Sequence, residues 1–298
     1  MSVADTNALH ALASDGAAFS RKATAIRIIW TIATREVRDA VRNRWLIAFA
    51  ICYALLSAAI SLLTRAAAGG VGAAGFGRTA AGLINLVMIL VPLMSMTAAA
   101  SSIAGERERG MLSFVLAQPV SLVEVLLGKF LGLSMSVCAA VALGFGVGAA
   151  LISGTGGADA AAFIEMTGLT GMLAVAMVSV GTLVSAWCRR TSTATTAVLL
   201  TWLTLVFGCD LILMGSHLAV QMGAPTVFHL ALVNPLQAFK SAALQPLGGS
   251  LDVLGPAAGW AVYVYGWWLR PILIAALAVW CVWPFTAAVV IMKRRGIA

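Results

Sequence analysis

Six long apolar stretches, separated by polar segments, run along the chain. They lie near residues 45–63, 82–104, 125–152, 167–187, 194–214 and 271–292. A helix of about 20 apolar residues is long enough to cross a bilayer core of ~30 Å. The pattern predicts an all-α polytopic membrane protein with six transmembrane helices. An even number of spans places both termini on one side.

The composition excludes a soluble globular domain. Of 298 residues, 61% are hydrophobic and 10% are charged, whereas globular chains carry roughly 25% charged residues. The net charge of +8 suits loops that face an anionic lipid bilayer, and we expect no nucleic-acid partner. The five cysteines are scattered without a CxxC pair, so we interpret them as small buried side chains and not as a disulfide or metal framework.

The basic residues predict the orientation in the membrane. Fifteen of the 19 lysines and arginines lie before the first span, between the second and third, between the fourth and fifth, or after the sixth. The positive-inside rule makes this side cytoplasmic, with both termini. Residues 1–22 carry acids and no long apolar core, so we expect a mobile cytoplasmic tail and not a signal peptide.

A second apolar pattern precedes the first span, with spacings of three and four residues. Its members are Ile26, Ile29, Trp30, Ala33, Val37 and Val41. This spacing predicts an amphipathic helix that lies in the cytoplasmic membrane interface, with its arginines near the lipid headgroups. The alternative, an ordinary soluble helix, would have no soluble core to pack against.

A charged island, GERERGMLSFVLAQP (105–119), separates the second and third spans. Its head is Glu106, Arg107, Glu108 and Arg109, which we expect to begin a helix. A single apolar face is predicted to follow, made of Met111, Leu112, Val115 and Leu116. Pro119 should stop this helix and Ser121 should cap the next. A helix of this kind at 105–117 suits docking into a groove on a soluble partner, and the alternative is a solvated turn that only links two spans.

The outer segment around residues 215–270 is long and fairly apolar. We expect short helices on the outer membrane surface, with tryptophans and tyrosines forming an interfacial belt. Asn234-Pro235 marks a turn, because the residue before proline resists the helical conformation.

Catalytic motifs are missing from the sequence. It contains no HExxH, GxSxG or GxxxxGK[ST] motif, so we expect no enzyme, and the energy must come from a partner or an ion gradient. Met214, His217, Met222 and His229 are groups that suit Cu(I), but their spacing matches no fixed site. We therefore predict no metal site in this chain.

Asp210 is the one acid that we place within a predicted span. A charge in hydrocarbon costs ~3 kcal/mol or more. The residue should therefore act as a gate or partner contact at the outer mouth, unless it lies close enough to the outer surface to be hydrated.

The helix ending in RNRW (42–45) and the block GERERGMLSFVLAQPVSLVEVLLGKFLG (105–132) resemble the type-2 ATP-binding-cassette permeases. The resemblance covers nearly the whole chain and implies one permease domain over 23–298. In that family the six-span subunit pairs with itself and with two cytoplasmic ATPase subunits, which bind ATP and magnesium. It also implies a bacterial inner-membrane location and no cofactor bound by the permease. Met111 stands where the family commonly has threonine.

Within this family, CDLILMG around Asp210 and NPLQAFK (234–240) are similar to the permeases of the nitrous oxide reductase maturation system. This resemblance implies maturation of the enzyme's copper centres, by moving a sulfur species or by working a periplasmic accessory protein. It also implies that the residues of the segment 105–117 named above contact the ATPase subunit and couple it to the permease. The expected contacts with the periplasmic partner are Asn234, Pro235, Phe239 and Lys240. The alternatives are an exporter of lipids or hydrophobic drugs, and an ATP-independent membrane scaffold.

Overall fold

The computed structural model describes residues 25–67, 73–118, 120–153, 160–208, 211, 223–245 and 256–295. A helix over 25–42 precedes α2 (Arg44–Ala67), α3 (Ala73–Glu108), α4 (Met111–Leu116), α5 (Leu122–Ser153), α6 (Ala160–Trp187) and α7 (Thr191–Leu203). A π-helix, η1 (Thr204–Gly208), continues α7, and after it come α9 (Ala224–Val233), α10 (Pro235–Leu244), α11 (Pro256–Tyr265), a 3-10 turn η5 (Gly266–Trp268) and α12 (Leu269–Arg295). Six of the described helices are long and apolar enough to cross a membrane. The predicted fold class is confirmed.

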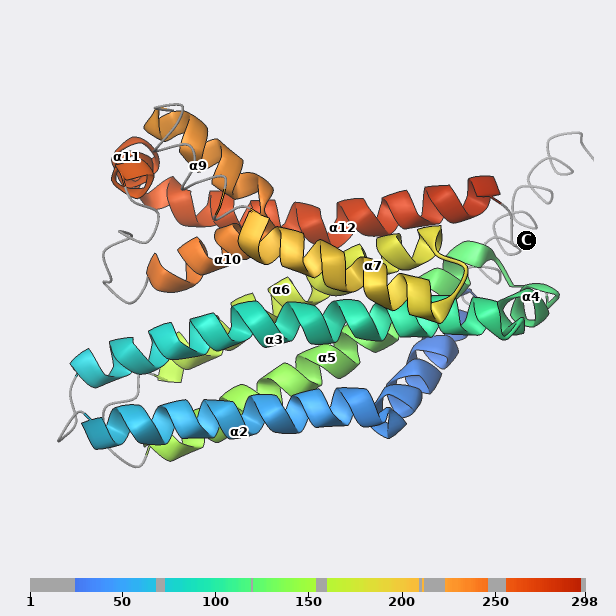
Figure 1. Ribbon diagram of the computed structural model, residues 1–298, viewed down its shortest axis with the longest axis horizontal. Helices are drawn as coiled ribbons and strands as arrows, with labels where there is room; N and C mark the ends of the chain where they lie inside the picture. The colour runs from blue at the N-terminus through green and yellow to red at the C-terminus, as the bar shows by residue number, and fades with distance from the viewer. Residues whose placement is uncertain are drawn as a thin grey trace, which may run out of the picture.

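The six long helices run alongside one another, and the short helices lie at the two ends (Figure 1). One end carries the helix 25–42, α4, the turn between α6 and α7, and the last turn of α12; we call it the α4 end. The opposite end carries α9 and α11. The two ends of the described chain therefore lie together, as an even number of spans requires.

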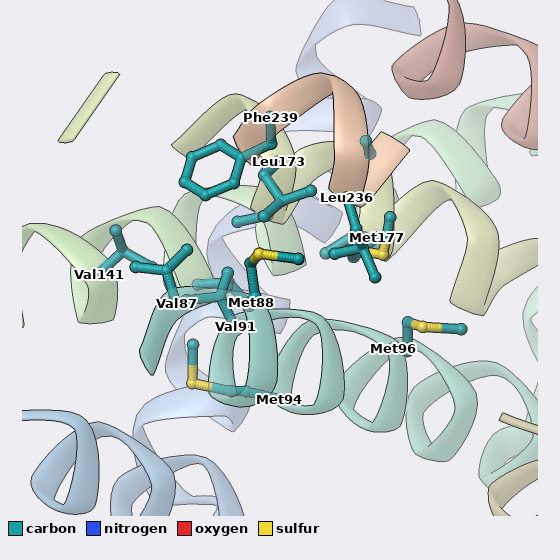
Figure 2. Packing of buried hydrophobic residues seen from close by; sticks show 14 of the residues in the cluster. Val87, Met88, Val91, Met94, Met96, Val141, Leu173, Met177, Leu236 and Phe239 are labelled. Carbon is teal, nitrogen blue, oxygen red and sulfur yellow. The ribbon is translucent and has the colours of Figure 1, made fainter. Parts of the chain in front are cut away.

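Helices α3 and α6 form the centre of the bundle. In the most apolar 18-residue stretch of each helix, 67% of α3 and 72% of α6 is buried inside the protein, against 11% for α7 and 22% for α2. Figure 2 shows the packing around α3 and α6, where Val87, Met88 and Val91 of α3 lie on the side that faces Leu173, Met177, Leu236 and Phe239. The last two belong to α10, so this helix inserts into the bundle. In the described parts of the outer segment, 223–245 and 256–270, the expected short helices are confirmed, but α10 does not lie on a surface.

Glycines on α5 allow two helices to approach it closely. A Cβ at Gly132 would lie 2.6 Å from the carbonyl oxygen of Ala33 in the helix 25–42. A Cβ at Gly144 would lie 2.1 Å from the Tyr53 ring of α2. These glycines of α5 therefore allow close packing between helices of the same subunit, as small residues commonly do between membrane helices.

The helix 25–42 packs against protein on one side only. Ala33 is 1% exposed and faces α5, whereas Ile26, Trp30 and Val41 are between 57% and 68% exposed. This helix packs against the spanning helix α5, because Gly132 and its neighbours on α5 open a surface for it. Its exposed apolar side is consistent with the predicted interfacial position, which stays a prediction.

Candidate functional site

The charged island closes α3. Glu106, Arg107 and Glu108 form the last turn of α3 and do not begin a new helix, so that expectation is wrong. Gly105 does not interrupt α3, and the break comes at Gly110, whose φ of 70° favours glycine. Acids at a helix C-terminus oppose the helix dipole. Each of them accordingly has a partner on another helix.

The first of these acids belongs to a buried ionic cluster. The ammonium of Lys129 on α5 lies 2.8 Å from Glu106 Oε1 and 3.0 Å from Glu36 Oε2. Its third hydrogen bond goes to Ser102 Oγ at 3.0 Å, and the Ser102 hydroxyl donates to Glu36. All three ammonium protons are therefore used. The side chains of Lys129, Glu36 and Glu106 are 4%, 9% and 14% exposed, and they join α5, the helix 25–42 and α3.

Arg107 and Glu108 hold the turn between α6 and α7. The guanidinium of Arg107 donates to the carbonyl of Cys188, just beyond the C-terminus of α6, at 3.1 Å. Glu108 Oε2 accepts from the backbone N–H of Thr191 at 2.9 Å and from its hydroxyl at 2.6 Å. A cation thus stands at a helix C-terminus and an anion at a helix N-terminus, as the helix dipoles favour. Glu108 takes the place of an N-cap for α7, since Arg190 makes no side-chain cap bond.

Helix α4 has a buried side and an exposed apolar side. Leu112 is 1% exposed and packs into a cluster with α3 and α5, and Val115 packs partly against the same cluster. Met111 is 44% exposed and Phe114 is 67% exposed. The four residues predicted to form one apolar face are therefore split, with Leu112 buried and Met111 exposed. The exposed side also carries Phe114, three residues after Met111, which the sequence analysis did not select. The side chain of Leu116 lies outside the described part of the chain.

An apolar groove of about 510 Å³ separates α4 from the helix 25–42. Its walls include Ile28, Ile32, Met111, Phe114, Arg27 and Arg35. The groove can accept an apolar side chain from a soluble partner, and the guanidinium groups at its wall suit a neighbouring carboxylate. It adjoins the exposed side of α4, so the two form one continuous candidate docking surface.

A second, polar cavity of about 620 Å³ lies at the same end of the bundle. Glu106, Glu108 and Arg109 line it, together with Glu36 and Asp39 of the helix 25–42. Within the described residues, no group of three or more His, Cys, Asp or Glu side chains could hold a metal ion.

The residues after the predicted Asn234-Pro235 turn lie mostly in the core. The turn itself is confirmed, since α9 ends at Val233 and α10 begins at Pro235. Asn234 is 6% exposed, Phe239 is 0% exposed and Pro235 is buried, whereas Lys240 is partly exposed. Only Lys240 of the four offers an accessible side chain to a periplasmic partner in this subunit.

Asn234 has two hydrogen-bond partners. Its Oδ1 accepts from the backbone N–H of Leu236 at 2.9 Å and caps α10. Its Nδ2 donates to the carbonyl of Leu205 at 2.6 Å, and Leu205 belongs to the π-helix that continues α7. One side chain thus joins the fifth span to the junction of α9 and α10.

Asp210 lies outside the described residues, as do Met214, His217 and Met222. His229 is exposed, with Nδ1 2.6 Å from the carbonyl oxygen of Pro225.

The fourth span also carries an acid within its apolar stretch. Glu165 on α6 forms an ion pair with Arg270 at the start of α12. The sequence analysis missed it because the fourth span was predicted to begin at residue 167, whereas α6 begins at Ala160.

Comparisons with known proteins agree with this architecture. The chain matches the family described as "ABC-2 family transporter protein" over residues 30–297. It is 42% identical over 125 residues to a probable ABC transporter permease protein NosY of Pseudomonas aeruginosa, covering 42% of this chain and 46% of that protein. It is 38% identical over 125 residues to the probable NosY permease of Stutzerimonas stutzeri, covering 42% and 45%. Each of these matches spans a little under half of the relative's length.

Proposed function

Because the chain belongs to the ABC-2 family of transporter proteins, we propose that it couples ATP hydrolysis by a cytoplasmic ATPase to movement of its six spans in the bacterial inner membrane. ATP and magnesium bind to the ATPase subunits, and this chain supplies neither a catalytic residue nor a cofactor. Two copies of the chain pair with two ATPases, as in the family that the sequence resembles.

The exposed apolar side of α4 carries this proposal. Met111 and Phe114 stay in solvent beside the groove, although α4 is held firmly by Leu112 on its other side. A rigid helix with an exposed aromatic side chain suits docking into a groove on the ATPase. Glu108 and Arg109 are exposed next to it and extend the docking surface with charge. Glu106 acts indirectly, through its ion pair with Lys129.

The charged island passes movement of α4 to the spanning helices. Its side chains bond to α5, to the end of α6 and to the start of α7. Lys129 of α5 extends this contact to Glu36 of the helix 25–42. When ATP draws the two ATPases together, α4 moves with them and the last turn of α3 follows. This turn is bonded to three helices directly and to a fourth through Lys129. The helices therefore shift as rigid bodies, which is a usual form of such transitions.

The positive-inside rule orients the molecule. Lys293, Arg294 and Arg295 end α12 at the α4 end, so this end faces the cytoplasm. At the opposite end Tyr263 and Trp267 are 89% and 77% exposed. These aromatic side chains suit the periplasmic interface of the bilayer.

For the physiological role, we propose maturation of the copper centres of periplasmic nitrous oxide reductase. The support is the resemblance at NPLQAFK (234–240) and the matches to two permeases named NosY. The subunit moves a sulfur species or works a periplasmic accessory protein, which meets it at the end that carries α9, α11 and the exposed part of Lys240.

Docking is tested by purifying the permease with its ATPase from cells that express both. Phe114→Asp places a charge on the docking surface, so the ATPase should be lost from the preparation. Tyr263→Asp is the matched control, because it makes a similar change at an exposed aromatic on the opposite end, and it should retain the ATPase. If Phe114→Asp retains a normal amount of ATPase, α4 is not the docking helix. If even the wild type purifies without ATPase, the scaffold alternative is favoured.

The physiological role is tested on nitrous oxide reductase from cells with and without this gene. We expect the deletion to yield enzyme with a low copper content and without the absorption of its sulfide-bridged cluster, and the wild-type gene to restore both. A fully loaded enzyme in the deletion strain would remove this role. ATPase activity stimulated by lipids or hydrophobic drugs would then favour the exporter.

A further inference from the structure

Helix α7 packs least of the described spans. Only 11% of its most apolar 18-residue stretch is buried inside the protein, and the buried residues of the helix are Ala194 and Val198. Its contacts with other spans are chiefly with α3. Two small buried side chains give little interlocking along the helix, so its side contacts resist displacement along its own axis only weakly.

The α4 end of α7 is nevertheless firmly attached. Glu108 binds both the backbone N–H and the hydroxyl of Thr191, the first residue of the helix. This contact acts on the backbone of α7, so it moves the helix when the last turn of α3 moves. No other span described here begins with a cap supplied by the charged island.

The far end of α7 is attached as well. The carbonyl of Leu205 accepts from Asn234, and this contact again involves the backbone of the extended helix. It falls in a π-helix, a distortion that is frequent at functional sites. From Thr191 to Gly208 the helix is about 27 Å long at ~1.5 Å per residue. It therefore connects the charged island to the junction of α9 and α10.

We propose that α7 is the element that carries movement of the charged island to the outer helices, and that Asn234 is the positioning residue at its outer end. The inference rests on the proposed function, because the movement originates at the ATPase. Asn234 is suited to this role because one amide joins the end of α7 to the junction of α9 and α10. Its oxygen holds the first turn of α10 while its nitrogen holds α7.

The outer helices are placed to respond. Leu236 and Phe239 anchor α10 in the core next to α6, and α9 leaves the same junction toward α11, with which it packs through Phe228 and Trp260. A displacement of Asn234 therefore tilts α9 against a fixed α10. The periplasmic face changes shape without a passage through the bundle, which supports mechanical action on a periplasmic partner.

Asn234→Ser separates the two roles of the side chain. A serine hydroxyl still caps α10, as serine does at helix N-termini, but it is too short to reach Leu205. Ser241→Ala is the matched control. It removes a buried hydroxyl from α10, one that bonds only the carbonyl of Gln237 in the same helix, and it leaves the contact with α7 intact.

Hydrogen–deuterium exchange of the permease–ATPase complex in lipid nanodiscs, with and without ATP and vanadate, measures the coupling. In the wild type and in Ser241→Ala, we expect nucleotide to change exchange in peptides from 111–118 and from 224–245. In Asn234→Ser the change at 111–118 should persist and the change at 224–245 should be lost, with ATPase binding intact.

Each other outcome is informative. An unaltered response at 224–245 in Asn234→Ser overturns the role of Asn234 and leaves the proposed function standing. A wild-type complex that responds at 111–118 but not at 224–245 overturns transmission through α7 without the need for a variant. A chain that recruits no ATPase contradicts the proposed function itself.

Discussion

Removal of the Lys129 ammonium should destabilise the subunit more than a typical surface substitution. Lys129 compensates two carboxylates, at 2.8 and 3.0 Å, in a site where its side chain is 4% exposed. At ~4 Å between charge centres and an effective dielectric constant of about 20, each attraction amounts to roughly 4 kcal/mol before the cost of desolvation. Breaking a buried ion pair by removing one partner costs about 3–5 kcal/mol net, because the remaining charge stays buried without compensation.

Lys129→Met keeps most of the side-chain volume and removes the charge. For a chain of this size each kcal/mol corresponds to roughly 2–4 °C in Tm. We therefore expect thermal unfolding of the purified subunit in detergent to begin at least about 6 °C below the wild type.

The control replaces the whole cluster by neutral groups, as Glu36→Gln, Lys129→Met and Glu106→Gln together. No buried charge then lacks a partner, so most of the lost Tm should return. The reasoning is refuted if Lys129→Met alone unfolds within about 1 °C of the wild type, or if the triple variant is less stable than the single one.

Three further changes probe other contacts. Glu108→Ala should speed amide exchange in the first turn of α7 while Glu108→Gln, which still accepts hydrogen bonds, should not, and equal rates in both would contradict the cap. Gly132→Ala should cost about 1–3 kcal/mol of unfolding free energy through overpacking, whereas Gly146→Ala, which meets nothing within 4 Å, should be nearly neutral; two similar melting curves would count against the close helix contact. Reversing Arg270 to Glu should lower Tm, and adding Glu165→Arg should restore part of it; a pair of independent effects would show that the two residues do not interact.

The membrane spans could be predicted well from sequence because hydropathy is a local property. All six predicted spans have a counterpart among the described helices, and Ser121 caps α5 together with Glu124 in a reciprocal pair of hydrogen bonds. Each of these features depends on residues a few positions apart. A single sequence is sufficient to recognise them.

The partners of the charged island could not be predicted in the same way. Glu106 lies beside Lys129 and Glu36 only after three helices have packed. The pattern of alternating acids and bases predicted the start of a helix, whereas in the structure these residues end α3 and bond to groups on other helices. The exposed position of Phe114 likewise depends on which side of α4 the bundle covers.

The same limit applies to the outer segment. The resemblance at NPLQAFK implied that Asn234, Pro235 and Phe239 contact a partner, but α10 turns back into the core and buries them. Nothing local to NPLQAFK distinguishes a helix that inserts between α6 and α12 from one that lies on the surface.

The central claim is that the ATPase meets the exposed side of α4, and photo-cross-linking tests it most directly. A photoreactive phenylalanine analogue placed at Phe114 in native membranes should form an adduct with the ATPase. The same analogue at Tyr263, which is even more exposed than Phe114 but lies at the opposite end, should not. An ATPase adduct from position 263, or none from position 114 in a complex that hydrolyses ATP, would contradict the account.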